Sequence, residues 1–75
     1  MNISDVMIHV NESLSEDART SLENAMRKID GVVSPGFNAD KAHLLLITYN
    51  TEKTTTAALL ETVRAAGYTG QVVGM

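Results

Sequence analysis

The change of pattern at residues 11–19, where an alternating strand gives way to an amphipathic helix, constrains the fold of this chain most. Before it, apolar side chains occupy every second position, which is the period of a strand with one buried face. The positions on that face are Val6, Ile8 and Val10. After it, apolar residues recur every three or four positions, as on a helix with one buried stripe. They are Ala18, Leu22, Ala25, Met26 and Ile29.

Two residues in this turn are suited to begin the helix. Ser13, with Glu16 three positions later, has the spacing of a capping box. Ser15, followed by Glu16 and Asp17, is suited to the N-cap position, with both carboxylates in the positively polarised first turn. Both starts lead into the same helix, which Gly31 is suited to close in a left-handed conformation.

The rest of the chain predicts three more strands and a second helix. The strands are expected at residues 32–33, 44–49 and 68–73. Pro35 and Gly36 interrupt the first of them, which places it at a sheet edge because proline cannot donate to an inner ladder. Residues 38–41 form a hairpin turn, a threonine among residues 54–56 caps the helix, and Gly67 ends it. The expected buried residues of this helix are Leu59, Leu60, Val63 and Ala66.

The order of elements, βαββαβ, predicts an α+β fold. It is a ferredoxin-like sandwich, in which a four-stranded antiparallel sheet carries two helices on one face. A single domain is expected over residues 1–75, because a core of this size buries only about 60% of the unfolded chain's surface. The composition, 44% hydrophobic and 20% charged, is typical of a globular protein.

Charge and composition exclude several classes of function. The net charge is −3 and the six basic residues are dispersed, so we expect no nucleic-acid partner. No apolar run approaches the ~20 residues of a membrane span, so no membrane insertion is expected. The N-terminus resembles no signal peptide, which favours a cytoplasmic location. There is no Ser/His/acid constellation and no Gly-rich phosphate loop, so we expect neither enzymatic activity nor a cofactor.

Four stretches of the chain follow a known pattern. They are Leu22-Glu23, Ile-Asp-Gly-Val at residues 29–32, Ile-Thr-Tyr-Asn at residues 47–50, and residues 59–68, which end in Gly-Tyr. In these stretches the chain resembles the heavy-metal-associated domain of copper chaperones, mercury carriers and the N-terminal domains of metal-transporting ATPases. The resemblance runs almost end to end. Because it involves mostly packing positions, it specifies the fold well and the function poorly.

The functional motif of that family, Gly-Met-Thr-Cys-x-x-Cys, is absent. Counting back from Leu22-Glu23 aligns it with residues 12–18, so that its two cysteine positions hold Ser15 and Ala18. The chain contains no cysteine at all. Soft Cu(I) and mercury need soft thiolate donors, which a hydroxyl and a methyl group do not supply. Copper transfer by thiolate exchange is therefore excluded, and none of the family's metal ligands carries over to this chain.

Two other groups of side chains are candidate metal ligands. Glu12, Glu16 and Asp17 cluster in the replaced turn, where a hard cation such as Mg²⁺ or Ca²⁺ would find oxygen ligands. The other interpretation is that they cap the helix and complement its dipole. His9 and Met7 lie on the outer face of the first strand, and His43 precedes the third, so a Met/His copper site is a second alternative. The other interpretation is that both imidazoles are ordinary, partly exposed side chains.

The third predicted strand is apolar on both faces. If Leu45 and Ile47 face the helices, then Leu44 and Leu46 face outward beside Met7 and expose an apolar patch. Such patches often mark protein interfaces, and we name Met7, His9, Leu44 and Leu46 as candidate interface residues. Two alternatives stay open: the helix-to-sheet register is shifted by one residue, or long polar neighbours shield the leucines.

Three hypotheses about function follow. The first is a protein-interaction or accessory module related to metal-trafficking proteins, which binds a protein partner or associates with itself. The second is a heavy-metal-binding or transport protein that uses His/Met or carboxylate ligands. The third is a regulatory domain that acts beside a separate transporter or enzyme.

Overall fold

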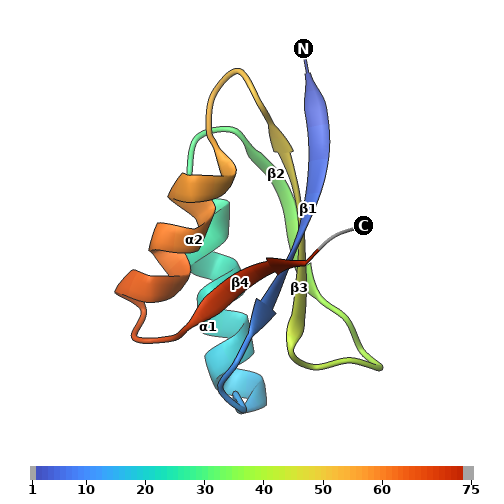
Figure 1. Cartoon of the computed structure of the whole chain (residues 1–75), viewed down its shortest axis with the longest axis vertical. Coiled ribbons are helices and arrows are strands. Elements are labelled where there is room, and N and C mark those ends of the chain that lie inside the picture. The colour runs from blue at the N-terminus through green and yellow to red at the C-terminus, as the bar shows by residue number, and fades with distance from the viewer. Residues whose placement is uncertain (1, 74–75) are drawn as a thin grey trace.

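The alternating and helical patterns of the sequence become two layers, a sheet with both helices on one of its faces (Figure 1). A computed structural model describes residues 2–73. Its elements are β1 (Ile3–Val10), α1 (Glu16–Arg27), β2 (Val32–Phe37), β3 (Leu44–Asn50), α2 (Thr56–Ala65) and β4 (Gly70–Val73). Among these residues, neither helix has the length and apolar composition that crossing a bilayer requires.

The strands pair in the order β2-β3-β1-β4, and every pair is antiparallel. The predicted ferredoxin-like βαββαβ fold is therefore confirmed, with β2 at one edge and β4 at the other. The sequence suggested that Pro35 interrupts this strand, but β2 continues through it to Phe37. Pro35 is buried opposite Ile47, and the irregularity lies earlier, as a register shift between Val32 and Ser34. An edge strand tolerates this proline because no further strand lies on its outer side to need a backbone N–H donor.

The core lies between the sheet and the helices. Its buried side chains are Val6, Ile8, Val10, Leu22, Met26, Leu45, Ile47, Tyr49, Leu59 and Val63. Every second residue of β1 and β3 enters this core, so the predicted burial of Leu45 and Ile47 is confirmed. Two expectations for the helix stripes are wrong. Ile29 lies beyond the end of α1, although it still packs on the core, and Ala66 is the exposed C-cap of α2.

The last strand is shorter than the pattern predicted, because it begins at Gly70 instead of Tyr68. Gly70 brings β4 close to the core: a Cβ at this position would lie 3.1 Å from both Ile8 Cγ2 and Val63 Cγ1. The absence of a side chain there lets β4 pair with β1 under the end of α2.

Candidate functional site

The turn between β1 and α1 is closed by hydrogen bonds within the chain. Ser15 is the N-cap of α1, and its Oγ accepts a hydrogen bond from the Ala18 backbone N–H at 3.1 Å. Of the two helix starts that the sequence allowed, Ser15 is therefore the one used. The Arg19 Nη1 donates to the Leu14 carbonyl oxygen at 2.9 Å. Ser15 and Ala18, which the sequence comparison aligned with the two cysteines of the heavy-metal-associated motif, are thus parts of a helix cap.

Glu12 ties this turn to the segment that leads into β4. Its Oε1 accepts a hydrogen bond from the Thr69 N–H at 2.8 Å, and the Asn11 N–H donates to the Thr69 carbonyl oxygen at 2.9 Å. Glu16 and Asp17 are exposed in the first turn of α1. Within residues 2–73 there is no cluster of three or more His, Cys, Asp and Glu side chains suited to hold a metal ion. The three carboxylates serve the turn and the helix start.

The bond between Glu12 and Thr69 predicts a pH-dependent signal. Hydrogen bonding from the Thr69 backbone holds the pKa of Glu12 below its usual value. The bond's contribution to stability is therefore complete above the usual pKa of about 4.3 and is lost as the pH falls through the lowered value. We expect the Thr69 amide proton shift to titrate with a midpoint below the usual pKa of a glutamate side chain. NMR between acidic and neutral pH measures it, and Glu12→Gln should abolish the titration. A Thr69 midpoint at or above the usual value contradicts the bond.

His9 and His43 come together, as the Met/His alternative requires, but in a stacked arrangement that the sequence did not predict. Their rings stack with centroids 5.3 Å apart and planes inclined by 14°. The Nδ1 of His43 lies 2.7 Å from the Val10 carbonyl oxygen, and the Nδ1 of His9 lies 3.1 Å from Asn11 Oδ1. Both oxygens are acceptors, so each Nδ1 carries the proton and each Nε2 is left as the possible ligand atom. A metal ion lies near the plane of each imidazole that binds it. Two stacked, nearly parallel rings do not meet this condition together.

The sheet face turned away from the helices, here called the open face, has an apolar row across all four strands. Leu46 on β3 pairs with Met7 on β1 and with Gly36 on β2, and Met7 pairs with Val73 on β4. We call Gly36, Leu46, Met7 and Val73 the apolar row. Leu46 is 41% exposed, and Leu44 lies half-buried on the same face. Polar neighbours therefore do not shield Leu46 from solvent. The helix-to-sheet register is not shifted by one residue either, because Leu45 and Ile47 face the helices.

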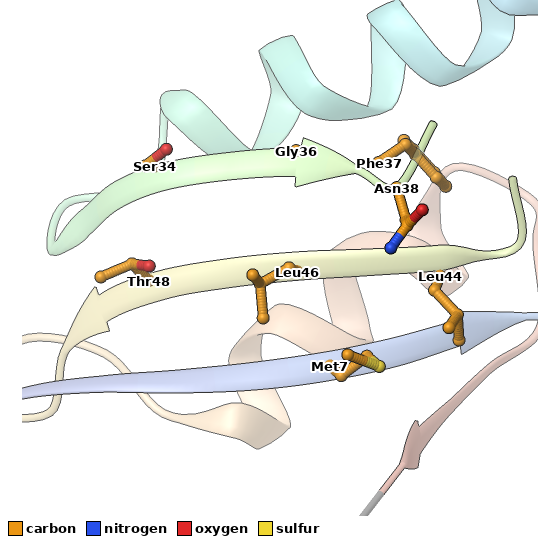
Figure 2. A pocket seen from close by; sticks show the side chains of 8 residues that line it. All are labelled: Met7, Ser34, Gly36, Phe37, Asn38, Leu44, Leu46 and Thr48. Atoms are coloured by element: carbon orange, nitrogen blue, oxygen red, sulfur yellow. The ribbon is translucent and has the colours of Figure 1, made fainter. Parts of the chain in front are cut away.

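A groove of about 220 Å³ runs along this face (Figure 2). Figure 2 shows Leu44 and Leu46 on β3 beside Met7 on β1. Gly36 leaves the far side open, since a Cβ there would meet nothing within 4 Å. The lining residues are Met7, Ser34, Gly36, Phe37, Asn38, Leu44, Leu46 and Thr48. Of the four candidate interface residues, Met7, Leu44 and Leu46 line the groove, while His9 lies next to it, paired with Leu44.

No family model matches the chain, and no curated protein matches it significantly. Solved structures match it closely. Oxidized MerP from Ralstonia metallidurans CH34 superposes with a TM-score of 0.87 at 19% identity, over 97% of this chain and all of MerP. The CopZ metallochaperone gives 0.80 at 23% identity, over 93% of this chain and 100% of CopZ. The fold is that of the heavy-metal-associated domains.

A third similar structure is a Cu(I)-loaded form. It is the N-terminal domain of a potential copper-translocating P-type ATPase from Bacillus subtilis, with a TM-score of 0.88 at 19% identity, over 97% of this chain and 90% of that domain. The predicted resemblance to heavy-metal-associated domains is thus confirmed for the fold. Where that family has its thiolates, this chain has the serine cap and the Glu12 bond described above. The chain has the heavy-metal-associated fold and contains no cysteine.

Proposed function

We propose that this chain is a protein-interaction or accessory module that works through its open sheet face. The single observation that carries this proposal is the partly exposed apolar row around Leu46, on the sheet face that the helices do not cover. Large apolar side chains that line a groove on a sheet face are unfavourable in water unless a partner covers them. The partner is a protein, and the chain itself carries out no catalysis.

The similar structures support a connection with metal trafficking. They include a metallochaperone and a domain of a copper-translocating ATPase, and both have the same fold over nearly the whole chain. A domain that keeps such a scaffold without thiolates is suited to act beside metal carriers, as a docking or regulatory unit, without carrying the metal by thiolate exchange. The cytoplasmic location expected from the sequence stays a prediction.

Site-specific photo-crosslinking tests the proposed interface. A photoreactive phenylalanine analogue replaces Leu46 on the open face or, as the matched control, Val72, which is 48% exposed and pairs with the core residue Ile8. We expect a protein adduct from position 46 and none, or far less, from position 72. The identified partner, purified and added to the ¹⁵N-labelled chain, should give saturable shifts at open-face amides. Equal adducts at both positions, or none at either, contradict the proposal.

Metal transport through other ligands is the second candidate. The observation that favours it is the contact of His9 with His43, which brings two imidazoles together where β1 ends and β3 begins, at one end of the two central strands. Their stacking opposes it, because one ring would have to turn and give up its Nδ1 hydrogen bond before both could bind one ion. Titration of the wild-type chain with Cu(I) and Zn²⁺ distinguishes the two candidates. Saturable shifts at both histidines support the metal carrier, and their absence removes it.

A further inference from the structure

We propose that the open face packs against the open face of a second copy of this chain, about a two-fold axis that runs along the apolar row. This inference rests on the proposed function and names its partner. In such a dimer the same surface is used by both copies, so the surface must be complementary to itself. The pattern of charged side chains on the strands has this property.

The strands carry very little charge. Their only carboxylate is Asp5 and their only imidazole is His9, and they contain no lysine or arginine. The chain has nine acidic residues, and eight of the nine lie on turns and helices and not on the strands. Two copies can therefore bring their open faces together without placing most of their like charges in contact.

Asp5 and His9 lie on opposite sides of the apolar row. Both are on β1, two residues before and two residues after Met7, and all three side chains belong to the open face. A two-fold axis along the row turns the second copy end for end, so that each Asp5 lies over the partner's His9 and each His9 over the partner's Asp5. Leu46 of one copy then packs against Leu46 of the other copy at the centre of the interface. Each carboxylate then faces an imidazole across the axis, and these two pairs are complementary.

Each of these groups keeps an atom for the partner. Asp5 Oδ1 accepts a hydrogen bond from Thr48 Oγ1 at 2.7 Å, which fixes the carboxylate and leaves Oδ2. His9 uses Nδ1 toward Asn11, and its stacking on His43 holds the ring, which leaves Nε2. Because Nδ1 is already a donor, Nε2 donates to the partner's carboxylate only in the imidazolium form, so each pair takes up one proton when the dimer forms. Both side chains are thus positioned before the dimer forms, and this lowers the entropy lost on association.

The hairpin between β2 and β3 is compatible with this arrangement. Residues 38–43 bend to the side of the sheet away from the helices (Figure 1). An axis along the apolar row places the hairpins of the two copies at opposite ends of the interface. Sheets that pack face to face keep their strands within about 30° of each other, and this arrangement allows such an angle.

The interface is small, because the four strands are only four to eight residues long. Interfaces at the low end of the size range bind weakly, so we expect a dissociation constant of about 10–100 µM. Sedimentation equilibrium of the wild-type chain from about 5 to 500 µM covers this range. Leu46→Asp should weaken the dimer at least about 100-fold, since a two-fold interface carries the change twice. Val72→Asp adds the same charge on the other face and should leave the dimer unchanged.

A charge exchange tests the position of the axis. Asp5→Lys removes the carboxylate that faces the imidazole and puts an ammonium group there, and His9→Asp brings two carboxylates together, so each single change should weaken the dimer about tenfold or more. The double variant Asp5→Lys/His9→Asp restores unlike pairs and should recover most of the wild-type affinity. Within one copy the two positions are roughly 13 Å apart along the strand, so their intramolecular interaction is weak. Circular dichroism identifies any variant that has not folded.

Three results overturn the proposed dimer: a strictly monomeric wild type at about 500 µM, a dimer that Leu46→Asp leaves intact, or a double variant no stronger than the single ones. Failure of the dimer and failure of the proposed function are distinguishable. A monomeric chain that gives a heterologous adduct from position 46 overturns only the dimer. A monomeric chain without any adduct at position 46 overturns both.

Discussion

The double variant Ser15→Cys/Ala18→Cys is expected to bind Cu(I) at least about 1,000-fold more tightly than the wild-type chain. Ser15 is the N-cap of α1 and Ala18 lies in its first turn, and the hydrogen bond between Ser15 Oγ and the Ala18 N–H already brings the two positions together. A helix N-terminus lowers the pKa of a cysteine thiol and so favours the thiolate that binds the metal. Competition with a chromophoric Cu(I) chelator measures the affinity.

The single variants Ser15→Cys and Ala18→Cys are the matched controls, and each should give far weaker binding, because one thiolate supplies only half of the ligand pair. Replacing the serine cap should cost about 1 kcal/mol of stability, which thermal unfolding measures. If the double variant is no better than the single ones, then the bond between Glu12 and Thr69 holds the turn in a conformation closed to metal. Glu12→Gln added to the double variant tests that explanation.

Much of the fold could be predicted because the local pattern and the final packing agree. The alternation in β1 and β3 follows from sequence period alone, and it placed Leu45 and Ile47 in the core correctly. The errors lie at element ends, where tertiary contacts decide. Ala66 fits the helical stripe by spacing, yet α2 has ended there and the residue is exposed. The last strand was predicted from residue 68, but β4 begins only at Gly70, where the absence of a side chain lets the chain approach the core and pair with β1.

The candidate site was only partly accessible from sequence, because its contacts join distant parts of the chain. The period of the strands put Met7, Leu44 and Leu46 on the open face, and the structure places them there. The register between strands could not be read from the sequence. It brings Gly36 opposite Leu46, and it joins Thr48 to Asp5 over 43 positions. The stacking of His9 on His43 likewise depends on the start of β3, where the local pattern is weak.

The turn before α1 and the open face differ in what their side chains do for the fold. In the turn, the side chains serve the fold, since Ser15 caps α1 and Glu12 holds Thr69. On the open face, Leu46 and Gly36 have no comparable role inside the chain, since one is exposed and the other has nothing near its missing side chain. Residues that the fold itself does not need are the better candidates for binding.

Three glycines allow the second large effect, a loss of stability, to be separated into its causes. Gly31 has a φ of 102°, and a Cβ there would lie 2.7 Å from the Cβ of Lys53. Gly67 has a similar φ of 95° but has nothing within 4 Å of that position. Gly36 has neither a positive φ nor a close neighbour. Alanine therefore meets an unfavourable φ and a close contact at Gly31, an unfavourable φ alone at Gly67, and neither at Gly36.

We expect Gly31→Ala to lower the free energy of unfolding by about 3 kcal/mol, Gly67→Ala by about 1 kcal/mol, and Gly36→Ala by no more than about 0.5 kcal/mol. A domain of 75 residues has roughly 4–11 kcal/mol in total, so the first change threatens the fold and the last does not. The contact costs most because the turn at Gly31 packs on the turn at Lys53, and the Asn50 N–H donates to the Gly31 carbonyl oxygen at 2.7 Å. The loop has little room to move away. Urea unfolding at constant m-value measures all three, and equal losses for Gly31→Ala and Gly67→Ala would show that the contact contributes nothing.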